Sequence, residues 1–145
     1  MTSVHFYHNT PDPLALACEL VASAQGRGRQ IAVRLPDAAS ARRLDLMLWT
    51  AQPQAFIPHV MAGSALAAET PVILGGPAAD TAWPHTDLLF NLADDLPPGF
   101  ERFRTVVEIV GQGEADRLPA RARWMQYKAR ALPLKAFDAE RRVAL

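Results

Sequence analysis

Apolar residues in the first half of the chain follow two spacings, one typical of strands and one typical of helices. Short runs rich in β-branched and aromatic residues alternate with longer segments in which apolar residues recur every three or four positions. This pattern predicts two strands and two helices in the alternating order Val4–Tyr7, Leu14–Ala24, Gln30–Leu35 and Ala38–Thr50. Asp12 followed by Pro13 is typical of an N-cap and a first helical residue, which places the start of the first helix.

The second half is richer in strand-like runs and contains one further helical segment. Three apolar runs predict strands at Pro71–Leu74, Asp87–Leu92 and Thr105–Val110. Pro58 disqualifies 56–60 as a central strand, so we expect an edge strand or a buried loop there. Phe100–Phe103 predicts a short helical turn. Asp116–Arg130 predicts a terminal helix in which Pro119 fits only within the first turn.

The order of these elements indicates the fold class. Apolar strands that alternate with helices favour a mostly parallel sheet with helices on both of its faces. The sequence shows no internal repeat, low-complexity segment or linker. We therefore expect an α/β fold in one domain that spans residues 1–145.

The predicted terminal helix carries two different stripes. At about 100° per residue, one narrow face groups three cations with an indole: Arg117, Arg121, Trp124 and Lys128. An apolar stripe centred about 100° further round is the natural core contact: Leu118, Ala122, Met125 and Ala129. The cationic face then points outward, and we expect three neighbours to widen it: Arg123, Tyr127 and Arg130.

Helical phase also predicts a second outward-facing indole. In the predicted helix Ala38–Thr50, the apolar side is formed by Ala41, Leu44, Met47, Leu48 and Ala51. Trp49 falls nearly opposite that side, beside Arg42 and Asp45. Because large aromatic residues are usually buried, an exposed indole is a candidate contact for a partner.

The charge balance restricts the partners. Fifteen basic residues equal fifteen acidic ones, so no global field attracts nucleic acid or anionic lipid. Five cations and no acid lie between Arg117 and Arg130, so an electrostatic partner must be met locally. Cys18 is the single cysteine, which excludes an internal disulfide. Neither a signal peptide nor an apolar run long enough for a bilayer is present, and we expect a cytoplasmic protein without membrane contact.

The motifs of an α/β enzyme are missing from the sequence. No phosphate-binding Gly-x-x-x-x-Gly-Lys-Ser/Thr run occurs, and the first strand is followed by His8–Asp12, where a dinucleotide site needs glycines. The four histidines show no i, i+4 pair that would bind a metal. We expect no catalytic residues, no cofactor and no metal.

Two kinds of binding remain open for the basic and aromatic helix. It could track phosphates and stack on the bases of single-stranded nucleic acid. It could instead bind an extended acidic peptide, because arginine forks bind carboxylates and an indole with apolar neighbours receives a terminal side chain. The zero net charge and the short basic face favour the peptide.

The sequence resembles the chi subunit family of bacterial DNA polymerase III over nearly its whole length. The block from Leu44 through His59, with LDLMLW and FIPH, is the most specific part of the likeness. Further matching positions are Pro71, Val72, Asn91, Leu92, Phe100, Phe103, Val106–Val110, Arg121–Trp124, Tyr127 and Lys128.

This resemblance implies a three-layer α/β/α fold, related to nucleotide-binding folds but without catalysis. It also implies an accessory role in the clamp-loader complex, linking the replicase through the psi subunit to the acidic, phenylalanine-terminated tail of single-stranded DNA-binding protein. The family's tail-binding residues fall on Trp49, Val110, Arg117, Arg121, Trp124 and Lys128. A psi-binding surface is expected at Phe56, Ile57 and Pro58.

Three positions depart from the family pattern. Trp124 replaces a frequent tyrosine, which keeps an apolar plate but loses a hydroxyl. Met125 occupies a position that is basic in some relatives, and helical phase directs it toward the core. Ala131 replaces a frequent glycine, so we expect the helix to run further before its cap.

Overall fold

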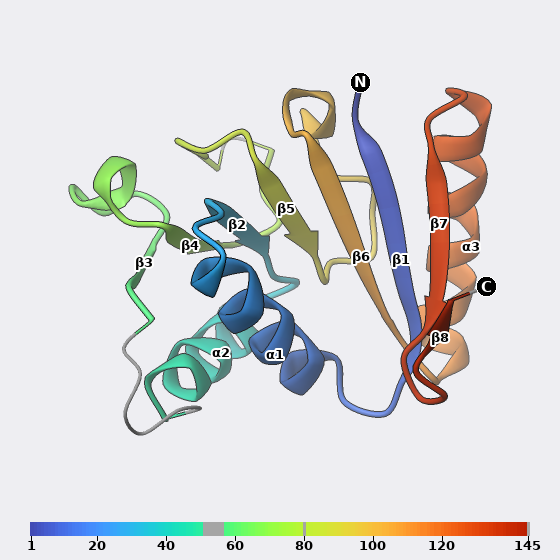
Figure 1. Cartoon of the computed structure of the whole chain (residues 1–145), viewed down its shortest axis with the longest axis horizontal. Helices are drawn as coiled ribbons and strands as arrows, with labels where there is room; N and C mark the ends of the chain where they lie inside the picture. The colour runs from blue at the N-terminus through green and yellow to red at the C-terminus, as the bar shows by residue number, and fades with distance from the viewer. Residues whose placement is uncertain (51–56, 80, 145) are drawn as a thin grey trace.

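The computed structural model describes residues 1–50, 57–79 and 81–144. Its eight strands form one sheet in the order β3-β4-β2-β5-β6-β1-β7-β8 (Figure 1). All pairs are parallel except the last, β7 with β8. The strands are β1 (Ser3–Thr10), β2 (Ile31–Arg34), β3 (His59–Met61), β4 (Val72–Gly75), β5 (Leu88–Asn91), β6 (Thr105–Gly111), β7 (Leu134–Asp138) and β8 (Val143–Ala144). The helices are α1 (Pro13–Gly26), α2 (Ala38–Thr50) and α3 (Glu114–Ala129), with 3-10 turns at Ala67–Glu69 and Phe100–Arg102.

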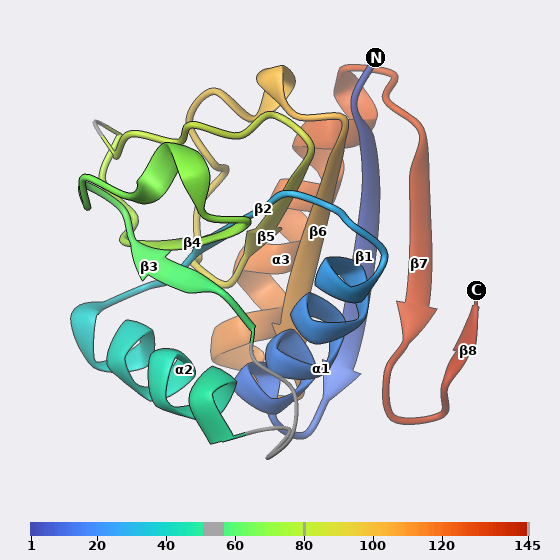
Figure 2. The same cartoon turned by 60° about the vertical axis from the view of Figure 1, so that its left-hand side comes forward.

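The sheet has helices on both faces, which confirms the expected three-layer, mostly parallel α/β fold. Helices α1 and α2 cover one face and α3 covers the other (Figures 1 and 2). Residues alternate along the strands between the two interfaces. On the side of α1 and α2, Val33 and Phe90 belong to the same core cluster as Leu44. On the side of α3, Phe6 and Leu89 belong to the same cluster as Tyr127.

The predicted strands and helices of the first half are confirmed, including the start of α1. Asp12 is its N-cap, and the Asp12 carboxylate accepts a hydrogen bond of 3.1 Å from the Ala15 backbone N–H. Pro13 is the first helical residue. Of the predicted segment 56–60, residue 56 lies outside the described residues, and His59 and Val60 belong to β3 at one edge of the sheet, as the proline rule predicted.

The predicted helix Asp116–Arg130 is confirmed as α3, but the prediction that it is the last element of the fold is wrong. After α3 the chain adds β7 beside β1, and β8 pairs with the end of β7. The helix also begins at Glu114 with Gly113 as its N-cap, so Pro119 lies inside the helix and not in its first turn. Its N-terminal start therefore precedes the predicted one by two residues.

The prediction of which side of α3 is buried is also wrong. Ala120, Arg123 and Tyr127 are buried against the sheet. The expected core stripe faces solvent instead: Leu118 is 61% exposed and Met125 is 57% exposed. Arg123 and Tyr127 therefore do not widen the cationic surface.

The reason is a carboxylate buried in the sheet beneath the helix. Glu108 on β6 is fully buried and accepts hydrogen bonds from Arg123 Nε (3.0 Å) and the Tyr127 hydroxyl (2.6 Å). The Asn91 side chain donates to the same carboxylate at 3.0 and 3.1 Å, and Asn91 in turn accepts from Arg34 Nη1 at 3.1 Å. A buried charge without partners costs several kcal/mol, so the helix turns its hydrogen-bonding residues inward.

Strand register assembles this network. Arg34, Asn91 and Glu108 are direct neighbours across β2, β5 and β6. Burial raises the pKa of the Glu108 carboxyl, and the Arg123 guanidinium opposes that rise. Burial and the adjacent Glu108 also raise the pKa of the Tyr127 hydroxyl, which keeps it a hydrogen-bond donor.

Helix α3 ends at Ala129, so the prediction that Ala131 lets the helix run further is wrong. Ala131 has a φ of 56°, in the left-handed region, and its N–H donates to the Lys128 carbonyl oxygen at 3.0 Å. The alanine therefore adopts the conformation that a C-terminal glycine takes without strain.

We expect Ala131→Gly to stabilise the fold. The left-handed conformation destabilises an L-residue by about 1–2 kcal/mol, and glycine removes this strain. The greater conformational freedom of glycine in the unfolded chain opposes the gain by about 0.4–1 kcal/mol. The free energy of unfolding in urea should therefore rise by about 0.5–1 kcal/mol. Ala122→Gly, in the exposed middle of the same helix, should lower it by about 1 kcal/mol. A loss of stability in both variants would contradict the strain at Ala131.

Candidate binding pocket between α3 and the sheet

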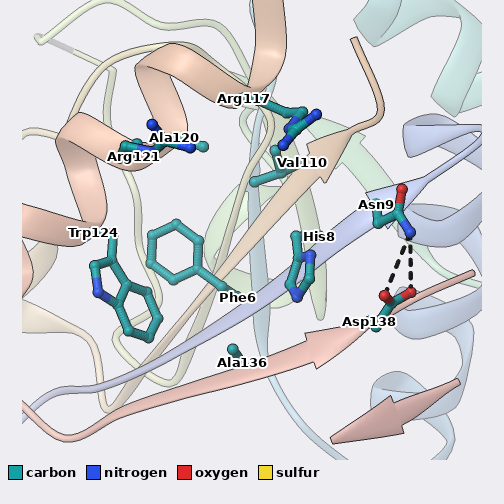
Figure 3. A pocket seen from close by; sticks show the side chains of 10 residues that line it. All are labelled: Phe6, His8, Asn9, Val110, Arg117, Ala120, Arg121, Trp124, Ala136 and Asp138. Carbon is teal, nitrogen blue, oxygen red and sulfur yellow. Dashed lines mark hydrogen bonds between the residues drawn. The ribbon is translucent and has the colours of Figure 1, made fainter. Parts of the chain in front are cut away.

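A pocket of about 530 Å³ lies between α3 and the carboxyl ends of β1, β6 and β7 (Figure 3). The sheet contributes Phe6, His8, Asn9, Val110, Ala136 and Asp138. The helix contributes Arg117, Ala120, Arg121 and Trp124. Because β1 lies between β6 and β7 and is parallel to both, the carboxyl ends of these three strands, which are distant in sequence, lie side by side. The pocket therefore depends on the strand order.

An aromatic pair forms the apolar end of the pocket. The rings of Phe6 and Trp124 meet edge to face, with centroids 5.1 Å apart and an interplanar angle of 71°. Trp124 is partly buried against the core cluster on this side of the sheet and also lines the pocket. The predicted outward indole is thus a pocket wall, with one part packed and one part accessible. Val110 adds a further apolar lining residue.

Two arginines give the pocket its charge. Arg117 and Arg121 are exposed, line the pocket and lie one helical turn apart on α3. Neither forms an ion pair with any residue that the structure describes. Each guanidinium can therefore present its paired N–H donors to a carboxylate.

Asp138 and Asn9 line the pocket on the sheet side, away from Trp124 (Figure 3). The Asp138 carboxylate accepts from the backbone N–H groups of Glu140 (3.1 Å) and Arg141 (3.0 Å) and from the Asn9 amide (3.3 and 3.4 Å) (Figure 3). The Arg141 N–H contributes most to lowering the pKa of Asp138, so this carboxyl carries a negative charge at neutral pH. An anionic ligand is therefore attracted by Arg117 and Arg121 on the helix side of the pocket and repelled by Asp138 on the sheet side.

The structure brings together four of the six residues predicted to bind the tail: Val110, Arg117, Arg121 and Trp124. Lys128 is exposed on α3, one turn beyond Trp124, but does not line the pocket. Trp49 is 54% exposed, which confirms its outward orientation, and its ring centroid lies 5.1 Å from that of His59. It belongs to α2, on the other face of the sheet from α3 (Figure 2), so it does not contribute to this pocket.

The segment predicted to bind psi is only partly described. Phe56 lies outside the described residues. Ile57 is 3% exposed and belongs to the core on the side of α1 and α2, whereas Pro58 is partly exposed.

The other six lining residues of the pocket were not predicted as site residues: Phe6, His8, Asn9, Ala120, Ala136 and Asp138.

In the part of the chain that the structure describes, no cluster of three or more His, Cys, Asp or Glu side chains is suited to hold a metal ion. Over residues 1–50, 57–79 and 81–144, no helix has the length and apolar character to cross a membrane.

Comparison with known proteins identifies the family. The family model described as "DNA polymerase III chi subunit, HolC" matches residues 1–135. The chain belongs to the DNA polymerase III chi subunit family. The resemblance noted in the sequence is thereby confirmed.

Curated chi subunits are similar over most of their length. The DNA polymerase III subunit chi of Pseudomonas aeruginosa is 36% identical over 93% of this chain and 95% of its own length. The chi subunits of Haemophilus influenzae and Escherichia coli are 28% and 29% identical over 78% of this chain, and over 78% and 76% of their own lengths.

A solved structure shares the fold of this chi family member at low sequence identity. The Hef helicase domain of Pyrococcus furiosus aligns with a TM-score of 0.57 at 15% identity. The alignment covers 77% of this chain but only 28% of the helicase chain. The likeness concerns the fold alone.

Proposed function

We propose that this chain is a non-catalytic accessory subunit of the DNA polymerase III clamp-loader complex that binds the acidic C-terminal tail of single-stranded DNA-binding protein. The observation that carries the proposal is the pairing of two exposed arginines with an aromatic wall in one pocket. Family membership supplies the replication context. The pocket supplies the chemistry that an acidic, phenylalanine-terminated peptide requires.

Each part of the pocket matches one part of such a peptide. Arg117 and Arg121 hold carboxylates, including the terminal one, through bidentate hydrogen bonds. Trp124 and Val110, with Phe6 at the base, receive the phenylalanine ring and the preceding residue. Lys128 adds attraction from outside the pocket. Because a short peptide buries little surface, we expect an affinity on the order of micromolar that weakens with salt.

The other partners follow from the same family context. We propose that the psi subunit, where present, connects this chain to the clamp loader in the cytoplasm, and that residues 1–145 act as one domain. The surface at Phe56, Ile57 and Pro58 stays a prediction for psi. Because Ile57 is buried, a partner on that surface would contact Pro58 before Ile57.

The test is binding to single-stranded DNA-binding protein with and without its tail. In isothermal titration calorimetry, the intact binding protein should bind and the tail-truncated form should not. A third titration uses bare single-stranded oligonucleotide, which the rival nucleic-acid function predicts to bind with a strong salt dependence. Equal binding of the intact and truncated proteins would overturn the tail proposal. Binding of oligonucleotide alone would favour the rival.

A further inference from the structure

The outward side of α3 is apolar although it has no partner in the described chain. Leu118 and Met125 are two turns apart and more than half exposed, and Ala122 and Ala129 are also exposed on the same side. The buried side of the helix is fixed by Ala120, Arg123 and Tyr127. We call Leu118, Ala122, Met125 and Ala129 the outer stripe.

The outer stripe adjoins the cations of the pocket. At about 100° per residue, Arg121 lies about 60° round the helix from Trp124 on one side and about 60° from Leu118 on the other. Met125 follows Arg121 by one turn, so their side chains are neighbours on the helix surface. A peptide leaving the pocket past Arg121 therefore reaches Met125 directly. The exposed acid on this side of the helix, Glu114, lies one turn before Leu118 at the start of α3.

The charges around the outer stripe indicate the occupant. Arg117, Arg121 and Lys128 border it along one flank, and all three are exposed. Glu114 is the single acid on that flank and lies at its N-terminal end, so the flank carries a net positive charge. Two copies of the chain packed antiparallel through this stripe would bring these cationic flanks together, which repels. An acidic peptide with interspersed apolar residues matches both the flank and the stripe.

We propose that the outer stripe is a second contact surface for the acidic peptide whose C-terminal residue occupies the pocket. Apolar side chains a few residues upstream of the C-terminus cover Leu118 and Met125, and acidic side chains between them face the cationic flank. This inference rests on the proposed function. It adds a specificity determinant, because the pocket alone does not select among peptides that differ only upstream.

The experiment uses the full chain and three synthetic acidic peptides ending in phenylalanine. One has four residues, one has ten with two upstream apolar residues, and one has ten with serine at those two positions. We expect the apolar ten-residue peptide to bind about five- to tenfold more tightly than the serine peptide. In the Leu118→Ser/Met125→Ser chain this advantage should vanish, while the four-residue peptide should bind as before. Both substitutions are at exposed sites, and circular dichroism checks the fold.

The outcomes separate the inference from the proposed function. The outer stripe is excluded if the double variant keeps the full preference for the apolar peptide, or if it weakens the four-residue peptide as much as the long one. If no peptide binds the wild-type chain at all, the proposed function itself fails. Loss of the upstream preference alone, with short-peptide binding intact, supports the outer stripe.

Discussion

Arg123→Met should lower the free energy of unfolding by about 3–5 kcal/mol. The substitution keeps most of the side-chain volume but removes the cation whose Nε donates to Glu108 at 3.0 Å. Glu108 is fully buried, so water cannot solvate its carboxylate in place of Arg123. Arg123 also donates to the Asp94 carbonyl oxygen at 2.7 Å, and that acceptor loses its donor as well. Urea unfolding followed by circular dichroism measures the loss.

The matched control is Arg121→Met on the same helix. Arg121 is exposed and makes no ion pair with a described residue, so its replacement should change stability by no more than about 0.5 kcal/mol. A loss below about 1 kcal/mol for Arg123→Met would show that the Glu108 network does not hold α3 in its orientation.

The size of this effect should depend on pH. Without Arg123, burial raises the pKa of Glu108 further above its unfolded value of about 4.3. Between the two pKa values the folded state binds the proton and the unfolded state releases it, so stability falls as pH rises. The difference between the Arg123→Met chain and the wild type should therefore shrink as pH is lowered from about 7 to about 5. A difference independent of pH would mean that Glu108 stays ionised.

Strands β1, β2, β4, β5 and β6 could be predicted because they are short, nearly continuous apolar runs. Three of these runs nevertheless carry one polar residue close to the end: Arg34, Asn91 and Glu108. Such residues in a strand covered on both faces indicate a buried polar network. Which of them meet follows from the order β2-β5-β6 and the register, and the sequence alone contains neither.

The orientation of α3 could not be predicted from periodicity, because two stripes competed. Burying Leu118 and Met125 is favourable, but leaving Glu108 without Arg123 and Tyr127 costs more. The orientation that buries Arg123 still leaves Arg117 and Arg121 exposed. The prediction that these two arginines face outward was therefore correct, although the predicted buried side of the helix was wrong. Asp138 lines the pocket from β7, a strand that was not predicted, and its hydrogen bond from Asn9 on β1 could therefore not be foreseen.

Arg121→Ala should weaken binding of an acidic, phenylalanine-terminated peptide by about ten- to a hundredfold. The guanidinium lies beside the apolar wall of the pocket and has no competing ion pair among the described residues. A carboxylate held by it therefore loses two charge-assisted hydrogen bonds when the side chain is truncated. Calorimetric titration of the peptide into the variant measures the change. Arg121→Lys retains the positive charge but not the paired N–H donors of the guanidinium. Its affinity for the peptide should fall between those of the wild-type chain and the Arg121→Ala chain.

The control for charge is Arg43→Ala, which removes one cation from an exposed site on α2, on the other face of the sheet. General attraction would make the two alanine variants lose the same affinity, and the loss would disappear at high salt. If Arg121 makes a bidentate contact in the pocket, the Arg121→Ala chain should bind the peptide far more weakly than the Arg43→Ala chain. Part of that difference in affinity should remain at high salt. Identical titrations for the two variants would remove Arg121 from the site and, with it, the main support for tail binding by this chain.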